Sequence, residues 1–209
     1  MTLVLMYYIR LVERIGGLAF SSVRSTRVFT AIEMVMTQGS VDIGLPGVRV
    51  FEVTVRPDDR GFFAELYRAD WTEQFSETIR QSNLSFTYPG VVRAWHRHTR
   101  GQVDYFCVLH GALRVCAYDP DSGKLAEVIA SEHKRVIVRV PGHYYHGSMA
   151  LGPSPATLVY LTSALYDYSN PDEERIAWND RSVCPTEVNG RKDDPRVGQP
   201  WDWLRPVHR

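Results

Sequence analysis

One stretch of 24 residues decides how the rest of the chain is interpreted. It reads Tyr88-Pro-Gly-Val-Val-Arg-Ala-Trp-His96-Arg-His98-Thr-Arg-Gly-Gln-Val-Asp-Tyr-Phe-Cys-Val-Leu-His-Gly111. A Pro-Gly turn opens it, an apolar run delivers two histidines, and a second strand-like run ends in a His-Gly turn. Because side chains alternate between the two faces of a strand, His96 and His98 should lie on one face. Two histidines on the inner face of a β structure predict a small-molecule site inside a barrel.

The composition is that of an ordinary globular domain with tails, at 209 residues and 44% hydrophobic content. Lys and Arg number 24 and Asp and Glu also number 24, so nothing indicates a nucleic-acid surface. Three cysteines form no C-x-x-C pair, which argues against a disulfide framework and fits a reducing compartment. The sequence has no apolar run of the roughly 20 residues that would span a bilayer.

The segments around the central stretch have the pattern of short strands separated by turns. Residues 48–56 alternate and are rich in β-branched side chains, and Asp119-Pro-Asp-Ser-Gly123 is typical of a hairpin loop. One or two short helices are expected, at residues 70–80 and after Pro171. This pattern predicts an all-β protein built as a jelly-roll barrel, that is, a double-stranded β-helix. Further strands are expected at residues 62–67, 81–87, 112–118, 125–129, 135–140 and 156–165.

Three parts of the chain are expected. Residues 1–43 form an N-terminal extension of uncertain role, within which Met34 and Met36 are alternative starts of translation. Residues 44–180 form the barrel. Residues 181–209 are rich in Pro, Gly and charge but keep two tryptophans, so they should form an irregular arm that packs on the barrel.

The histidines allow two kinds of chemistry. His96, His98 and the distant His146 have the spacing of a cupin metal site, and imidazole with a carboxylate suits Fe, Mn, Ni or Zn. That motif normally carries a Glu soon after the second His, where this chain has Gln102 and Asp104. The alternative is acid–base chemistry, in which a histidine removes a proton next to a ketone and a tyrosine on the opposite wall returns one. We favour the second interpretation, which needs neither a metal nor a cofactor.

Five motifs that follow one another within residues 48–180 carry a family resemblance. They are Asp59-Arg-Gly-Phe-Phe-Ala-Glu65, Gln81-Ser-Asn83, Gly90-Val-Val-Arg-Ala-Trp-His96, Pro141-Gly-His-Tyr-Tyr-His-Gly147 and Pro171-Asp-Glu-Glu-Arg-Ile-Ala-Trp-Asn-Asp180. Together they resemble the dTDP-4-dehydrorhamnose 3,5-epimerase family. The resemblance implies a cupin fold, a homodimer and a cytoplasmic enzyme of deoxysugar biosynthesis that acts on a dTDP-linked 4-keto-6-deoxyhexose.

The resemblance also implies roles for individual residues. His96 would be the base that removes the proton next to the keto group, and Asp193 would orient it. Tyr160 would be the acid, with Tyr166 or Tyr168 as alternatives. Arg60 and Glu65 would contact the nucleotide across the dimer. The substrate-binding set implied in this way is Arg60, Phe63, Glu65, Gln81, Asn83, Arg93, His98, His146 and Tyr166.

One departure from the family concerns Asp104. The family has a Lys at this position, which stabilises the enolate formed when the proton is removed, and such a donor contributes a few kcal/mol. A carboxylate would repel the enolate, so Arg100 or His98 would have to supply the positive charge. The resemblance therefore implies a divergent epimerase, which acts on one or both carbons. The alternatives are a metal-dependent cupin enzyme and a non-catalytic sugar-nucleotide binder.

Overall fold

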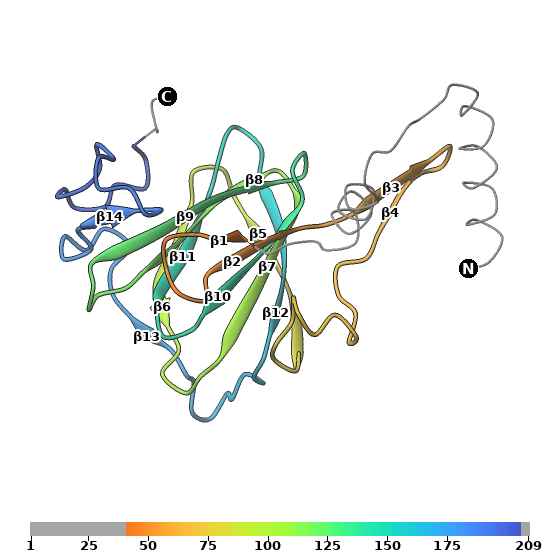
Figure 1. The fold of residues 1–209 in the computed structure, drawn as a ribbon, viewed down its shortest axis with the longest axis horizontal. Helices are drawn as coiled ribbons and strands as arrows, with labels where there is room; N and C mark the ends of the chain where they lie inside the picture. The colour runs from red at the N-terminus through yellow and green to blue at the C-terminus, as the bar shows by residue number, and fades with distance from the viewer. Residues whose placement is uncertain (1–40, 206–209) are drawn as a thin grey trace, which may run out of the picture. The chain divides into compact units, whose positions relative to one another are not determined.

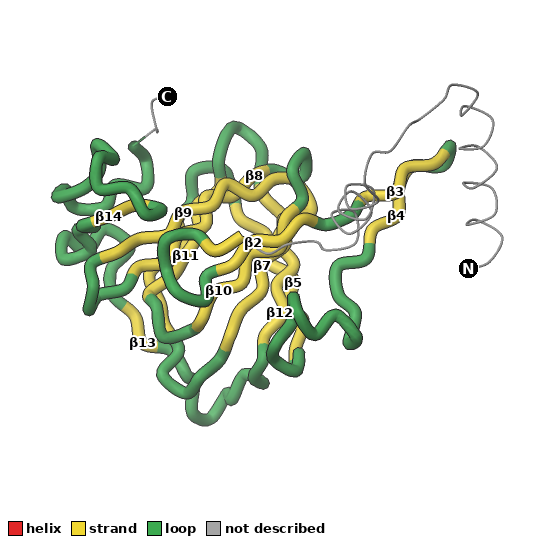
Figure 2. The backbone as a smooth tube through the Cα atoms, in the orientation of Figure 1, coloured by secondary structure: helices red, strands yellow, loops and turns green. Residues whose placement is uncertain are grey.

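The computed structural model describes residues 41–205, and within this range the chain consists of strands, turns and loops without a helix (Figure 2). Two six-stranded sheets face each other (Figure 1). This arrangement confirms the predicted all-β jelly-roll class. The predicted extension of residues 1–43 lies almost entirely outside the described residues. No helix in the described part is long and apolar enough to cross a membrane.

The first sheet contains the strand that follows the two histidines, at a central position. Asp104 and Phe106 of this strand, β7, lie on the face turned toward the second sheet, and Tyr105 and Cys107 lie on the other. In spatial order the sheet contains β1 (Val41–Asp42), β2 (Arg49–Glu52), β10 (Val136–Pro141), β7 (Val103–His110), β12 (Ala156–Thr162) and β5 (Gln81–Thr87).

The second sheet contains the strand that carries His96. This strand, β6, pairs with β11, so His96 lies opposite His146 in the register. In spatial order the sheet contains β13 (Glu174–Arg175), β6 (Val92–Arg97), β11 (Tyr145–Ala150), β8 (Ala112–Tyr118), β9 (Lys124–Ser131) and β14 (Glu187–Val188). A separate hairpin of β3 (Val55–Asp58) and β4 (Gly61–Ala64) projects away from both sheets (Figure 1).

The main hydrophobic core lies between the two sheets. Val108, Leu113, Val138 and Val140 are among its fully buried side chains. Gly111 forms the turn between β7 of the first sheet and β8 of the second with φ of 71°, and a Cβ there would come within 2.3 Å of a backbone oxygen, so glycine is required. The turn carries the chain directly from the first sheet to the second.

The predicted helix over residues 70–80 is wrong, since the segment forms turns. The Asp70 carboxylate, expected to cap the helix, instead accepts two hydrogen bonds from Arg68 at 2.7 and 2.9 Å. The Phe75 ring is buried against the outer face of the first sheet, beside Tyr105. Phe75 thus covers the sheet from a turn and not from a helix.

The helix expected after Pro171 is also absent. Glu174 and Arg175 form the short strand β13, which pairs with β6 opposite Arg97 and His96. Arg97 donates to the Glu174 carboxylate at 2.9 Å and reinforces this pairing. The segment therefore extends the sheet beside the central stretch.

A buried ion network joins the outer face of the second sheet to the segment of residues 181–205. Glu127 accepts from Arg196 at 2.8 Å and pairs with Arg114 at 3.0 Å, and these side chains are only 6–7% exposed. Arg114 also donates to the backbone carbonyl of Trp203, whose ring is fully buried against Trp95. The network and the tryptophans together hold this segment on the sheet.

Replacing Glu127 with Gln should strongly destabilise the protein. Two buried guanidinium groups would lose a counter-charge, and breaking a buried ion pair in this way costs about 3 kcal/mol or more. Urea denaturation measures the change in the free energy of unfolding. Glu132→Gln, which removes a solvent-accessible carboxylate paired with His110, is the matched control and should leave the free energy of unfolding close to the wild-type value. Equal effects of the two variants would contradict the assignment.

Candidate active site

A cavity of about 220 Å³ lies between the two sheets and borders the main core at Val115 and Leu158. Its walls come from β5, β7 and β12 of the first sheet and from β6, β8, β11 and β13 of the second. Both polar and apolar side chains line it. The predicted site residues that line it are Gln81, Asn83, Arg93, His96, His98, Asp104, His146, Tyr160 and Tyr166.

The local irregularity of β6 brings Arg93 and His96 to the same wall. The register between β6 and β11 shifts, so that His146 faces His96 while Ser148 faces Arg93. Residues three apart in sequence therefore point to one side, which simple alternation does not allow. A Cβ at Gly147 would come within 2.2 Å of the Ala94 side chain, so glycine permits the close approach of the two strands here. His96 and His98 both face the cavity, as alternation predicted.

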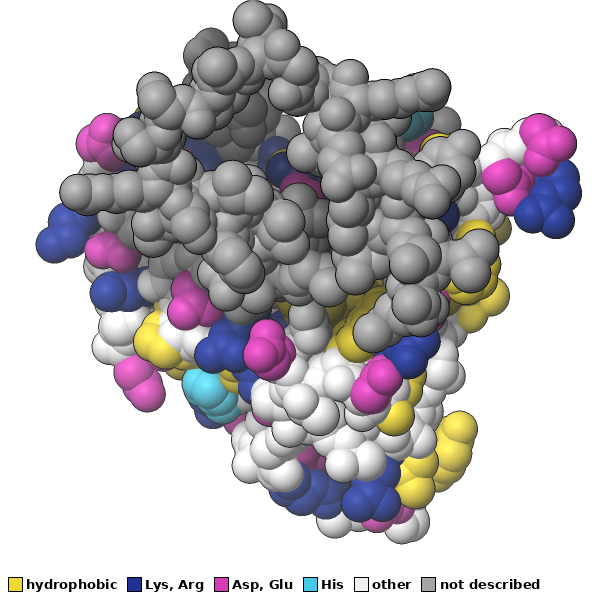
Figure 3. Space-filling model, turned by 45° about the vertical axis from the view of Figure 1, so that its right-hand side comes forward, with side chains coloured by type: hydrophobic (Ala, Val, Ile, Leu, Met, Phe, Trp, Pro, Cys, Tyr) yellow, Lys and Arg dark blue, Asp and Glu magenta, His cyan; other side chains and the backbone are white. Residues whose placement is uncertain are grey.

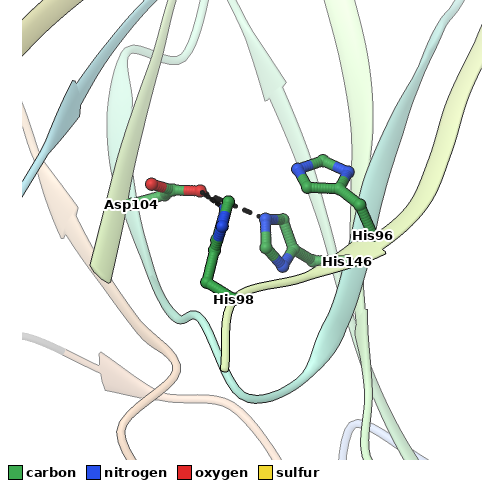
Figure 4. A group of neighbouring side chains, drawn as sticks. All are labelled: His96, His98, Asp104 and His146. Carbon is green, nitrogen blue, oxygen red and sulfur yellow. Dashed lines mark hydrogen bonds and ion pairs between the residues drawn. The ribbon is translucent and has the colours of Figure 1, made fainter. Parts of the chain in front are cut away.

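Three histidines and one carboxylate meet in the deepest part of the cavity (Figure 4). One ligand atom from each lies within 4.8 Å of the others. The Asp104 Oδ2 atom is 3.1 Å from His146 Nε2 and 3.4 Å from His98 Nε2. Figure 4 shows interactions from Asp104 to these two rings and none to His96. His146 is fully buried, and Asp104 and His98 are nearly so.

The far nitrogens of two of these rings are held by the backbone. His146 Nδ1 lies 2.9 Å from the carbonyl oxygen of Tyr144, and His98 Nδ1 lies 2.5 Å from that of Asp172. A carbonyl only accepts hydrogen bonds, so each Nδ1 carries the hydrogen and donates. Both rings therefore turn Nε2 toward Asp104.

The electrostatics of the site keep His96 neutral. Burial, together with the neighbouring His146 and His98, lowers the pKa of His96 to about 2. Burial opposes ionisation of Asp104, but the hydrogen bonds from His146 and His98 outweigh it and hold its pKa well below the ordinary value. At neutral pH the cluster therefore contains an uncharged His96 beside an ionised carboxylate.

Tyr160 lies on the opposite wall from His96, because it comes from β12 of the first sheet. Burial and the nearby Asp104 charge raise the pKa of its phenol, so it stays protonated at neutral pH. Tyr166 also lines the cavity, but Tyr168 does not and is 89% exposed. Of these three tyrosines, Tyr160 and Tyr166 therefore reach the cavity and Tyr168 does not.

Four residues implied by the family resemblance lie outside this cavity. The Asp193 side chain is 79% exposed and pairs with Arg191, so in this structure it does not orient His96, and that prediction is wrong. Arg60, Phe63 and Glu65 lie on or just after the projecting hairpin of β3 and β4. A role for these three in substrate binding requires a second copy of the chain.

The cavity also contains residues that the sequence analysis did not assign to the site. Ser85 lies on the same face of its strand as Gln81 and Asn83, so strand alternation could have predicted its place in the cavity. Glu173 and Arg175 belong to a motif that was identified, but only the pairing of β13 with β6 brings them to the cavity. Gln102 donates to Asp104 Oδ1 at 2.8 Å and holds the carboxylate in place.

Residues 42–188 match the protein-family model described as dTDP-4-dehydrorhamnose 3,5-epimerase. A probable low-salt glycan biosynthesis epimerase of Haloferax volcanii is 42% identical over 137 residues, which are 63% of this chain and 87% of that protein. A spore coat polysaccharide biosynthesis protein of Bacillus subtilis is 36% identical over 144 residues, 66% of this chain and 93% of that protein.

Solved structures resemble the fold described above. The dTDP-6-deoxy-D-glucose-3,5-epimerase of Legionella pneumophila, in complex with dTDP-4-keto-L-rhamnose, superposes with a TM-score of 0.62. The match has 22% sequence identity and covers 81% of this chain and 86% of that one, so it supports the fold. A dTDP-4-dehydrorhamnose 3,5-epimerase of Sulfolobus tokodaii has a TM-score of 0.59 at 27% identity, over 67% of this chain and 82% of that one.

Proposed function

Because the chain belongs to the dTDP-4-dehydrorhamnose 3,5-epimerase family, we propose that it epimerises a nucleotide-linked 4-keto-6-deoxy sugar. The observation that carries this proposal is the placement of His96 and Tyr160 on opposite walls of one cavity, on strands of different sheets. A sugar between the two sheets would have one face toward a neutral imidazole and the other toward a protonated phenol. Removal of a proton from one face and delivery to the other inverts the carbon.

The base step uses the free lone pair of His96. No described residue is hydrogen-bonded to its ring, and its lowered pKa keeps it unprotonated. In the proposed reaction it takes the proton from the carbon next to the ketone, and the bonding electrons move to the keto oxygen to form an enolate. Tyr160 then donates its phenolic proton to the same carbon from the opposite side, which restores the ketone.

The anionic part of the substrate would bind at the polar rim of the cavity. Arg93 and Arg175 line it and lie largely exposed, where a diphosphate has room to approach. Arg93 is oriented by hydrogen bonds to Thr87 Oγ1 and to the Phe86 carbonyl, both at 3.1 Å. Guanidinium groups fixed in this way suit bidentate contacts with phosphate oxygens.

A homodimer would complete the site. The outer face of the edge strand β5 exposes apolar side chains, with Leu84 72% and Phe86 49% exposed. Phe62 and Phe63 of the projecting hairpin are also more than half exposed. Hydrophobic side chains gather toward the right-hand edge of the face in Figure 3. An exposed apolar edge strand is a template for pairing with another chain, and pairing would bring Arg60 and Glu65 of the hairpin toward a neighbouring cavity.

The cytoplasm is the proposed location of this reaction. All three cysteines of the chain are free, and Cys107 and Cys116 are buried. Free thiols in this arrangement fit a reducing compartment.

Solvent exchange tests the proposed reaction directly. When the protein is incubated with dTDP-4-keto-6-deoxyglucose in heavy water, we expect deuterium to enter the carbons next to the ketone. Mass spectrometry and NMR locate the label. Labelling of both carbons makes the protein a double epimerase, and labelling of one makes it a single-centre enzyme, which the carboxylate at Asp104 would favour. Binding without any exchange would contradict the proposal and support a non-catalytic sugar-nucleotide binder.

A further inference from the structure

The two rings that face Asp104 have the hydrogen-bonding pattern of metal ligands. In both His98 and His146 the Nδ1 atom donates to a backbone carbonyl, and Nε2 points to the same carboxylate oxygen. Histidines that bind a metal almost always donate their other ring hydrogen to a carbonyl, a carboxylate or water, which fixes the ring and its tautomer. Two such histidines that converge on one carboxylate oxygen form a preorganised set of three ligand atoms.

Asp104 is ionised in a buried position beside both rings, so a positive charge within the cluster would stabilise it. Each ring donates through Nδ1, so in the neutral form of either ring the Nε2 lone pair is free to bind a metal. The lone pair of His146 Nε2 then faces Asp104 Oδ2 at 3.1 Å, at a position that is fully buried. Gln102 lies 3.1 Å from His98 Nε2 and 2.8 Å from Asp104 Oδ1, so it supplies amide hydrogens but no full charge. A shared cation would compensate the carboxylate and both lone pairs at once.

The distances match such a cation. With metal–ligand bonds of about 2.1 Å, neighbouring ligand atoms lie about 3.0 Å apart in octahedral and about 3.4 Å apart in tetrahedral geometry. The two observed distances from Asp104 Oδ2 are 3.1 and 3.4 Å. We propose that His98, His146 and Asp104 bind one divalent transition-metal ion, such as Fe²⁺, Mn²⁺, Co²⁺, Ni²⁺ or Zn²⁺.

His96 stands apart from these three ligands and keeps its role as the base. Its ring packs against that of His146, with centroids 4.2 Å apart, but has no interaction with Asp104 in Figure 4. Two histidines and one carboxylate leave open coordination positions, which is typical of catalytic rather than structural metal sites. The open side of the ion would face the cavity, where the substrate is proposed to bind.

This ion would supply what an enolate needs next to a buried carboxylate. This step rests on the proposed function. A negative charge that develops on the keto oxygen would be repelled by Asp104 alone, and a divalent cation reverses the sign of the local charge. The same three residues would therefore explain how a site with an aspartate in this position stabilises an enolate.

Titration of the full-length protein with Co²⁺ tests the site without any substrate. The protein is first treated with a chelator and dialysed, and binding is followed by the visible absorption of bound Co²⁺. We expect about one equivalent per chain for the wild type. His146→Gln and Asp104→Asn should each weaken binding by about 100-fold or more, while His96→Asn should stay within a few-fold of the wild type. His143→Gln, which removes an exposed histidine near His146, is the matched control and should bind as the wild type does.

Three results would overturn the assignment. One is the absence of saturable Co²⁺ binding by the wild type, which would leave a protonated histidine as the source of charge. Another is equal binding by the wild type and both ligand variants. The third is loss of binding in His96→Asn, which would make His96 a ligand. If the ligand variants do not fold, the melting temperature of the wild type decides, because Co²⁺ should raise it and a chelator should reverse the rise.

The role of the ion is tested separately from its binding. Deuterium exchange into the sugar should be lost after chelation and return when Co²⁺, Mn²⁺ or Zn²⁺ is added. Exchange that survives complete removal of the metal would leave the epimerase proposal intact and overturn the role of the ion. Metal binding without exchange under any condition would leave the metal site intact and contradict the proposed reaction.

Discussion

His96→Asn should lower turnover of the nucleotide sugar by about 10⁴-fold, at the upper end of what a positioned base contributes. Asn keeps the approximate size and polarity of the side chain but cannot accept a proton from carbon at neutral pH. The ring accepts no hydrogen bond from the described residues, so its loss should leave the cavity walls in place. Turnover and deuterium exchange are measured with the same substrate, and binding is measured by calorimetry with dTDP.

The control for this variant is His110→Asn, because His110 is exposed and pairs with Glu132 outside the cavity. It should have the wild-type rate and the wild-type affinity. An activity of His96→Asn within about tenfold of the wild type would remove His96 as the base. A parallel loss of dTDP affinity would instead indicate that His96 holds the cavity together.

The inward placement of His96, His98 and Asp104 was predictable from the sequence because strand alternation is a local property. Each of these residues lies in or next to a short β-rich run with turn residues at its ends, so its face follows from counting. The family motifs added the distant His146. The structure brings all four side chains into one cluster. Spacing in the sequence could suggest that they meet but could not give their positions relative to one another.

The errors have a common physical cause, since each depended on contacts between distant segments. Residues 70–80 begin with Asp70, which could cap a helix, but its carboxylate pairs with Arg68 and Phe75 packs on the outer face of the first sheet. Asp193 was placed near the base by spacing, but its position is set by how the segment after Asp180 packs on the second sheet. Arg175 became part of the cavity only through the pairing of β13 with β6.

Asp104 shows the limit of an argument from one position. In isolation, a carboxylate next to a proposed enolate indicates lost activity. The structure shows that this carboxylate is paired with two histidines. The charge next to the enolate is therefore that of the whole cluster and not that of Asp104 alone. The carbonyls of Tyr144 and Asp172 fix the orientation of the two histidine rings. No sequence pattern predicted that these carbonyls would lie beside the rings.

Tyr160→Phe should separate proton removal from inversion. The phenol is proposed to deliver a proton to the face opposite His96, and Phe keeps the ring but lacks the hydroxyl. His96 can still remove a proton and return one from solvent to the same face. We therefore expect deuterium to enter the substrate at a rate near that of the wild type, while formation of the inverted sugar falls about 10³-fold.

The contrast between Tyr160 and Tyr166 makes this prediction specific. Both line the cavity, but Tyr160 is held on β12 within the first sheet, whereas Tyr166 lies in the exposed segment after that strand. Tyr166→Phe should therefore invert the sugar at close to the wild-type rate. NMR of the sugar follows inversion, and mass spectrometry of the same sample follows exchange. Loss of inversion in Tyr166→Phe alone would transfer the acid to that residue, and loss of both exchange and inversion in Tyr160→Phe would mean that the phenol also stabilises the enolate.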